Sequence, residues 1–402
     1  DDVPGRLEAV MGMVRGLAVT GDLAGARHHR ARAIADAERW DDPELTARVI
    51  TAFDVPAVWT RNDDEELARQ VVAATERTLA ALPTDGTALR SRLLTTLALE
   101  SRGTTTDVGR RAAAEAEAIA RRLEDPALLA FALNGRFMHA FGRPGSMRER
   151  ATIGAELVEL ATAEGLVTFE VLGHLILVQT HAARAEFTAA DAHADAADRL
   201  ADRHEIPLVG VFTRWYAALR LAAAERDRPD AAEAAYGSAA ADLDRAGMPG
   251  LAGGLLPLAL LALRIARDEP IDADAWAETD WGPHEPWVRP LLLAAAGRGA
   301  EAAVAAAAVP ESPHDLLREA RLCLSARTAL ALGDDAATAR AYRELLPLAD
   351  ELVGAGSGLL SFGPVAGHLA DLATALGRPA EATEHRRQER EIATRAAEAG
   401  PA

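Results

Sequence analysis

The chain has 402 residues, more than a single compact core usually holds, so it either divides into domains or forms an elongated fold. Its 61 acidic and 43 basic residues give a net charge of −18, which repels a phosphate backbone and argues against direct nucleic-acid binding. Every basic residue is arginine, which excludes a Walker phosphate loop and a Schiff-base lysine, and the single cysteine excludes an internal disulfide.

The N-terminal residues carry no charged leader followed by an apolar segment, and the longest apolar runs are shorter than the roughly 20 residues of a membrane span. We therefore expect a cytoplasmic protein without membrane contact. The first residues already follow a helical pattern and include no initiating methionine, so we expect the native chain to extend upstream of Asp1.

Alanine, leucine and arginine recur at helical spacing along almost the whole chain, which predicts a nearly all-α protein. Irregular stretches are expected at 54–66 and 268–284, and Pro257 and Pro347 should kink or split the helices that contain them. Four helix starts are marked by a polar residue directly before proline, whose missing N–H costs nothing in the first helical turn. These four residues are Asp42, Asp125, Glu285 and Ser312.

A turn followed by an alanine-spaced helix recurs along the chain, with neighbouring copies about 36 to 44 residues apart or near twice that. This is the period of two antiparallel helices with their turns. We expect an all-α, right-handed superhelix (α-solenoid) of about nine or ten tetratricopeptide-like helix pairs. Residues 1–402 would form one elongated domain, with a break near 268–284 between sub-blocks 1–267 and 285–402. The copies begin at Gly21, Ala185, Arg228, Gly297, Gly333 and Gly377.

Three glycines between Gly354 and Gly358 raise the question of a phosphate-binding loop. A dinucleotide fingerprint requires a preceding strand and a further glycine, but the pattern here is helical and Ser361 occupies that last position. We interpret the glycines as a turn, and expect 357–377 to form the first helix of the last pair.

The two-helix unit resembles tetratricopeptide repeats, although the consensus tryptophan and tyrosine of the first helix are mostly absent. The stretches 124–136, 148–165 and 359–385 are similar to the C-terminal helical-repeat region of large actinobacterial transcriptional regulators, of the SARP type or the large ATP-binding LuxR type. In that family a DNA-binding domain and an ATPase module lie upstream. The resemblance implies a non-catalytic sensor or protein-interaction module that binds a partner protein, the upstream domains or a small-molecule effector. A stand-alone helical-repeat scaffold or oligomerisation protein is the alternative.

No catalytic or metal-binding signature emerges from the remaining polar residues. His204 and Glu205 lack the second histidine of a zincin motif, and residues two apart on a helix do not face one another. We therefore expect no enzyme activity, no cofactor and no metal. An unrecognised enzyme that uses surface carboxylates is the remaining rival. The residues weighed as ligands and set aside are Asp191, His193, Asp195, His174 and His181.

One polar constellation is the candidate binding site. Aligning three consecutive first helices places Asn134, His174 and Arg214 at identical repeat positions, 40 residues apart. First helices line the concave surface of a superhelix, so these side chains could form one row there. The alternative is that these side chains form an ordinary polar wall of the groove and bind no ligand. The predicted ligand- or partner-binding set is Asn134, Arg136, His139, His174, Gln179, Arg214, Trp215 and Tyr216.

Overall fold

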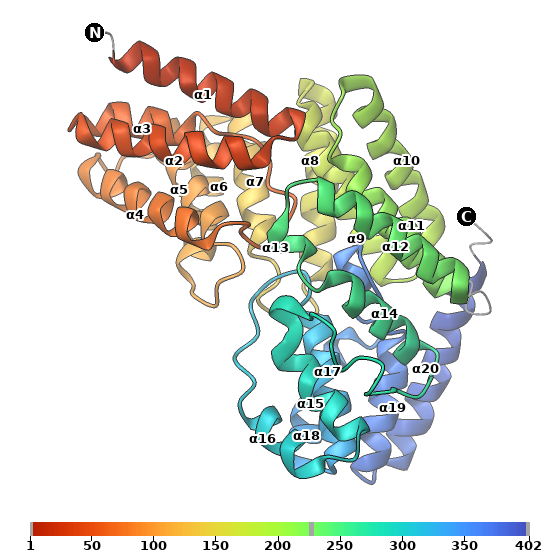
Figure 1. Cartoon of the computed structure of the whole chain (residues 1–402). Coiled ribbons are helices and arrows are strands. Elements are labelled where there is room, and N and C mark those ends of the chain that lie inside the picture. Colours follow the sequence, from red (N-terminus) through yellow and green to blue (C-terminus); the bar gives the residue numbers. More distant parts are fainter. Residues whose placement is uncertain (1–2, 225–228, 399–402) are drawn as a thin grey trace.

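The computed structural model describes residues 3–224 and 229–398 and folds them into α-helices, short 3-10 turns and no β-strand (Figure 1). The first twelve helices are α1 (Val3–Thr20), α2 (Leu23–Arg39), α3 (Pro43–Thr51), α4 (Glu65–Ala81), α5 (Ala88–Glu100), α6 (Val108–Leu123), α7 (Pro126–Met138), α8 (Met147–Glu164), α9 (Val167–Ala183), α10 (Phe187–His204), α11 (Val209–Ala224) and α12 (Pro229–Arg245). The remaining elements are α13 (Pro249–Ala252), α14 (Leu255–Ala266), η1 (Gly282–His284), α15 (Glu285–Ala295), α16 (Gly299–Ala307), α17 (Arg318–Leu332), α18 (Asp335–Leu345), η2 (Leu346–Leu348), η3 (Ala355–Ser357), α19 (Val365–Ala375) and α20 (Pro379–Glu398).

Helices adjacent in sequence pack as antiparallel neighbours, which confirms the all-α prediction. Five of the six predicted repeat copies start a helix two residues after the turn residue, at α2, α10, α16, α18 and α20. The turn of the copy at Arg228 lies outside the described residues. Gly297, Gly333 and Gly377 have φ angles of 75°, 65° and 70°, the left-handed conformation that ends a helix at little cost to glycine.

The proline-marked helix starts are correct at three positions and wrong at the fourth. Asp42 and Asp125 accept backbone N–H bonds at the starts of α3 and α7, and α15 begins at Glu285. At Ser312 no helix follows; α17 begins only at Arg318. Residues 308–317 form an irregular connector instead, in which the N–H of Leu316 donates to Thr60 Oγ1 at 2.9 Å and Asp315 pairs with Arg321.

The expectation of a helix over 357–377 is also wrong, because α19 begins at Val365. Residues 351–362 are all buried, in an irregular segment closed by a bridge between Leu352 and Pro364. Gly354, Gly358 and Gly363 have φ angles of 80°, 73° and 87°, which a right-handed helix cannot contain. We name residues 351–364 the glycine segment; it belongs to the core.

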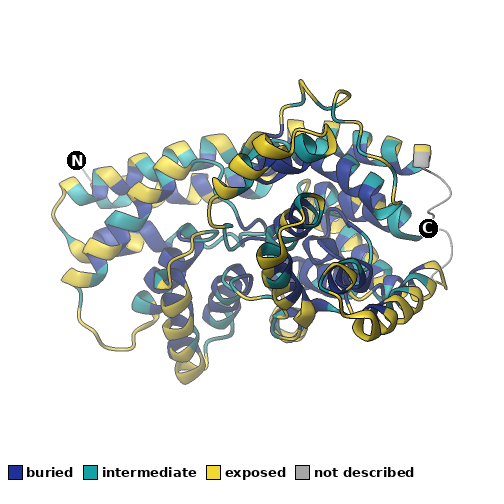
Figure 2. Cartoon of the chain, turned by 90° about the horizontal axis from the view of Figure 1, so that it is seen from below, coloured by how far each residue is buried: buried dark blue, intermediate teal, exposed yellow. Residues whose placement is uncertain are grey.

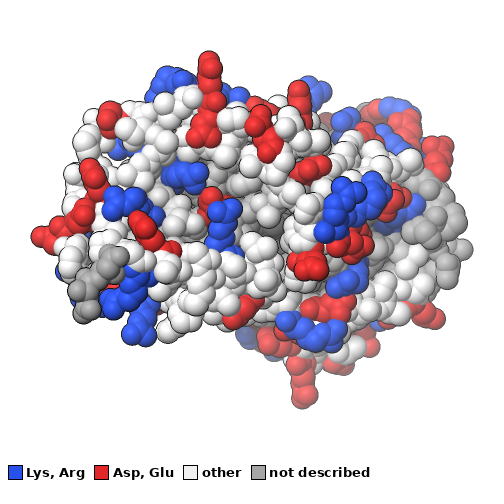
Figure 3. Space-filling model, turned by 90° about the horizontal axis from the view of Figure 1, so that it is seen from above, with Lys and Arg blue, Asp and Glu red and all other residues white. Residues whose placement is uncertain are grey.

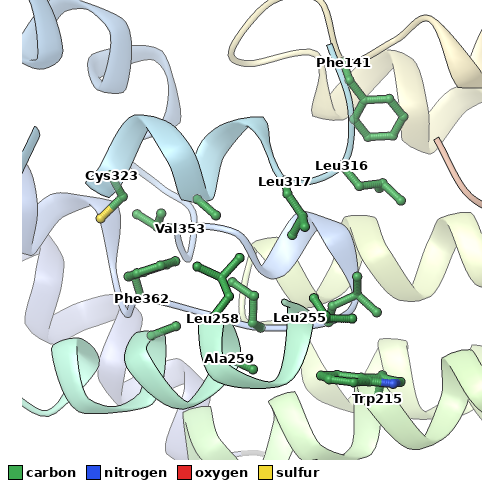
Figure 4. Packing of buried hydrophobic residues seen from close by; sticks show 14 of the residues in the cluster. Phe141, Trp215, Leu255, Leu258, Ala259, Leu316, Leu317, Cys323, Val353 and Phe362 are labelled. Carbon is green, nitrogen blue, oxygen red and sulfur yellow. The ribbon is translucent and has the colours of Figure 1, made fainter. Parts of the chain in front are cut away.

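Of the other predicted interruptions, the one at Pro347 is present, since this residue lies in the 3-10 turn that follows α18. Pro257 does not split its helix: the break between α13 and α14 lies at Gly253 and Gly254, and Pro257 is in the first turn of α14. Residues 268–281 contain no α-helix. One continuous hydrophobic core nevertheless includes Leu258 before this loop and Trp287 after it. Figure 4 shows how α14, α17 and the glycine segment contribute side chains to that core.

The chain folds back on itself in its C-terminal half. Helix α20 packs against α11, and the 3-10 turn η3 packs against α9, so the end of the chain lies beside its middle (Figure 1). Helices α1 to α5, which we name the N-terminal arm, bury a hydrophobic cluster of their own that includes Met11, Ile50 and Leu93. In Figure 2 exposed residues follow the outward helix faces, while the faces that meet other helices are buried.

Within the part of the chain that the structure describes, one segment is long and apolar enough to cross a membrane, Pro249–Ala266. By composition it passes that test, but 44% of it is buried inside the structure. Leu255, Leu258 and Leu261 from this segment are fully buried in the main core.

Candidate functional site

A pocket of about 210 Å³ lies beneath the N-terminal arm, which we name the arm pocket. Its volume exceeds the roughly 150 Å³ that accepts benzene and is below the roughly 300 Å³ of a drug-sized site, so it suits a compact molecule of about one ring. Its walls combine residues of the arm, the irregular segment 52–64, and the turns before α11 and α13. The apolar lining residues are Ala18, Leu23, Ala26, Ala31, Phe53, Val55, Pro56, Ala57, Val58, Trp59, Leu67, Ala68, Val71, Leu99, Leu208, Phe212 and Met248.

The segment 52–64 forms the floor of this pocket and is held by one buried side-chain amide. The Oδ1 atom of Asn134 accepts a hydrogen bond from the N–H of Ala57 at 2.9 Å, and its Nδ2 donates to the carbonyl of Ala57 at 2.7 Å. Asn134 is completely buried, so both of its polar atoms serve the backbone. It therefore positions the floor of the pocket from behind and does not face the cavity.

A buried ion pair lies in one wall of the pocket. The Nη1 atom of Arg30 donates to Oε1 of Glu100 at 2.5 Å, and the guanidinium also lies 4.5 Å from the ring centroid of Phe53. Arg102 donates to the carbonyl of Trp59 at 2.9 Å. Burial alone would raise the pKa of Glu100, but the charges of Arg30 and Arg102 outweigh it and the pKa is lowered. The wall thus stays ionised despite its burial.

A second ion pair connects the arm to the body of the protein. Arg27 on α2 contacts Asp63 at 2.9 Å and donates to the carbonyl of Gly247 at 3.3 Å. Asp63 also accepts a bond from the N–H of Gly250 at 3.0 Å. Burial raises the pKa of Asp63, opposed by the charge of Arg27. Movement of the arm would therefore break charged contacts with the turn between α12 and α13.

Three polar atoms of the lining are buried without a hydrogen-bond partner among the described residues: Trp59 Nε1, Arg30 Nε and Thr96 Oγ1. Most buried donors in folded proteins are paired, because an unpaired one costs about 1 to 3 kcal/mol. Two of the three are N–H groups, which can only donate. These atoms are shielded from the cavity surface, so a molecule with an apolar body and a hydrogen-bond acceptor would reach one of them only after a local side-chain rotation.

The sequence-predicted site residues do not line this pocket, and they differ in exposure and in hydrogen-bond partners. His174 and His193 place their Nδ1 atoms 2.9 Å apart across α9 and α10, whereas the exposed Arg214 pairs with Asp242 at 2.6 Å. Their role in binding remains a prediction. The other members have these partners: Arg136 pairs with Glu117 and Glu149, His139 meets the carbonyl of Ala98, Tyr216 donates to Asp191, Trp215 packs on Tyr236, and Gln179 is buried.

The histidines and carboxylates that were set aside as metal ligands are partly brought together. His193 contacts His174 and stacks on His181 at 5.5 Å between ring centroids, but Asp191 turns instead to Tyr216 and Arg220. In the described ranges no group of three or more histidine, cysteine or acidic residues is arranged to hold a metal ion.

The arm pocket was missed because its floor was interpreted only as an interruption between helices. The available signal was a tryptophan and several charged residues inside a non-helical stretch, 54–66. Comparisons with protein-family models, with curated proteins and with solved structures find no match to this chain.

Proposed function

We propose that the chain is a non-catalytic sensor and protein-interaction module of a multidomain transcriptional regulator, and that a small molecule binds in the arm pocket. The observation that carries this proposal is a cavity with a mostly apolar lining that also includes Trp59 and Arg30, each with a buried N–H group that has no hydrogen-bond partner among the described residues. The sequence resemblance to regulator repeat regions supplies the biological context. The proposal includes no cofactor and no covalent chemistry.

A ligand in this pocket would contact both the arm and the body. Ala26 and Leu67 belong to the arm, whereas Phe212 and Met248 belong to the body. The arm has a hydrophobic cluster separate from the main core, although α5 also packs against α6 and α7 through Leu94, Leu97 and Ala98. A molecule that binds more tightly when arm and body are close would favour that arrangement, and only this difference in affinity can move the equilibrium.

The partner that senses the change would be a protein segment or the upstream domains of the same regulator. The net charge of −18 disfavours direct nucleic-acid contact. On the face seen in Figure 3, arginine and acidic side chains are interspersed. We place the module in the cytoplasm, without membrane contact.

The ligand part of the proposal is tested with a panel of single-ring aromatic molecules, half of which carry a carbonyl or carboxylate acceptor. We expect ligand-observed NMR to detect binding of acceptor-bearing members to the native chain. Ala26→Leu should abolish it, because Ala26 is buried in the pocket wall and the larger side chain fills the cavity. Ala35→Leu, on the exposed side of the same helix, is the matched control. Equal binding to native protein and Ala26→Leu would disprove the assignment.

The regulator part is tested by mapping the transcript that encodes the chain. An upstream ATPase or DNA-binding domain in the same reading frame is expected. A translation start at residue 1 would contradict it and would favour the stand-alone scaffold. This result does not depend on the ligand experiment, so the two parts of the proposal can fail separately.

A further inference from the structure

A second cavity, of about 390 Å³, lies on the other side of the connector and has a different chemistry. Its walls come from the residues that follow α7, from α8, from the connector 308–317, and from α15, α17 and α18. We name it the arginine cavity. Five arginines and four carboxylates line it: Arg143, Arg150, Arg318, Arg321 and Arg340, with Glu311, Asp315, Glu319 and Glu344.

The inner carboxylates do not neutralise the inner arginines fully. Asp315 is buried and bound to Arg321, which also donates to Ser312 Oγ at 2.9 Å. Burial raises the pKa of Glu319, and the charge of Arg150 opposes this rise. Glu311 and Glu344 are exposed at the rim, where water and salt screen their charge. Away from the rim, three arginines, Arg150, Arg318 and Arg321, therefore face two carboxylates, Asp315 and Glu319.

Arg150 is the inner residue with unused donors. Its side chain is 3% exposed, and its Cζ atom lies 4.7 Å from the ring centroid of Phe141. Nη1 donates to the carbonyl of Gly356 at 2.9 Å, which fixes one edge of the group. On the other edge, Nε has no hydrogen-bond partner among the described residues and is itself shielded from the cavity, while Nη2 forms an ion pair with Glu319 at 3.7 Å, beyond hydrogen-bond distance.

An arginine edge with two parallel N–H donors matches the two oxygens of a carboxylate or phosphate. Arg318 is occupied by the carbonyl of Gly142 and does not compete for such a group. At the rim, Arg143 and Arg340 are exposed, and neither has an ion-pair partner in the described part of the chain. These two can reach a ligand from opposite walls, because one follows α7 and the other is on α18.

We propose that the arginine cavity binds a small oxyanion, the carboxylate or phosphate group of a metabolite, with Arg150 as the inner bidentate contact and Arg143 and Arg340 as rim contacts. Such a ligand would join α8 to α17 and α18, two parts of the chain that are distant in sequence. The inference is independent of the arm pocket, since the two cavities share no lining residue.

Isothermal titration of the whole chain with inorganic phosphate and, separately, with succinate tests the proposal at low ionic strength. We expect at least one of the two anions to bind at a single site, with an affinity that falls when salt is added. Binding of phosphate alone would indicate a phosphate group as the natural ligand, and binding of succinate alone a carboxylate group. The rim variant Arg143→Gln with Arg340→Gln should lose about tenfold or more in affinity, since two charged donors are removed. Arg69→Gln with Arg387→Gln, which are exposed elsewhere, should leave the affinity unchanged.

Arg150→Lys separates a bidentate contact from a simple positive charge. The lysine keeps the charge but not the planar pair of donors, so affinity should fall about tenfold while the fold, monitored by circular dichroism, is retained. Native affinity in this variant would remove Arg150 from the site. Binding of neither anion, or unchanged binding in the rim variant, would overturn the proposal, and the rim variant does not disturb a buried residue.

Discussion

The segment 52–64 and the glycine segment 351–364 both run irregularly through the interior of a helical protein. In the glycine segment, residues 351–362 are all buried. The N–H of Val353 donates to the carbonyl of Gly363, and the carbonyl of Val353 accepts from the N–H of Phe362. In 52–64 most residues are half-buried, and the indole N–H of Trp59 has no acceptor among the described residues. An irregular segment that pairs its own backbone groups can hold helices together, whereas one that leaves a buried donor in the wall of a cavity is suited to binding.

The largest expected effect tests whether the glycine segment is core. Phe362→Ala should lower the free energy of unfolding by about 3 to 5 kcal/mol, because the ring is fully buried and its removal leaves a cavity. Val55→Ala, in the half-buried segment 52–64, should cost about 1 kcal/mol. Urea unfolding of both variants measures the difference. Equal losses would mean that the two segments play the same structural role.

The next effect concerns the attachment of the pocket floor. Asn134→Ala should cost about 2 to 3 kcal/mol, because both backbone groups of Ala57 lose their buried partner. Limited proteolysis should then cut within 52–64. Asn62→Ala, which removes one half-buried bond to the carbonyl of Glu100, is the control and should cost about 1 kcal/mol. If the two variants are equally stable, Asn134 does not hold the floor.

Much of the helical framework could be predicted from local sequence signals. Helix-ending residues such as Gly333 and N-cap residues such as Asp42 act within one or two helical turns, so their positions can be predicted from the local sequence. The predictions failed at Ser312 and at 357–364, where distant contacts decide. The N–H of Leu316 donates to Thr60, and Arg150 reaches Gly356 from α8. No local pattern encodes such pairs. The superhelical arrangement itself stays a prediction.

The site was harder to predict because repeat position is not the same as surface position. Asn134, His174 and Arg214 share a register, yet they are respectively fully buried, half-buried and exposed. The chain folds back in its C-terminal half, so neighbouring repeats meet different surroundings. The arm pocket depends on contacts between residues more than a hundred positions apart, such as Arg27 and Gly247.

A pH-dependent effect should distinguish the glycine segment from 52–64. Burial raises the pKa of Glu351 to about 8, and Glu319 adds to this while Arg150 opposes it. The folded protein then holds a proton that the unfolded chain releases above its ordinary pKa of 4.5. Stability from this group is therefore greatest below pH 4.5 and falls as the pH rises toward 8.

Glu351→Gln should remove this slope, because the amide is neutral at every pH. We expect urea unfolding of the native chain to show a lower free energy at pH 8 than at pH 5.5, and a smaller difference in the variant. Asp64→Asn at the N-terminus of α4 is the control, since it replaces a carboxylate outside the glycine segment. An unchanged slope in Glu351→Gln would show that its carboxyl is ionised in the fold.

The smallest expected effect on stability is at Trp59, where binding and folding should separate most clearly. Trp59→Phe removes a buried N–H that has no acceptor in the described residues, which relieves a desolvation cost, while the smaller ring loses packing. These contributions oppose each other, so the free energy of unfolding should change by about 1 kcal/mol or less. Binding of acceptor-bearing ring molecules should weaken about fivefold or more, because their hydrogen-bond donor is gone. Trp40→Phe, at a tryptophan that is 51% exposed, should change neither quantity. A large loss of stability without loss of binding would mean that Trp59 is a packing residue and that the ligand, if bound, is recognised through Arg30 alone.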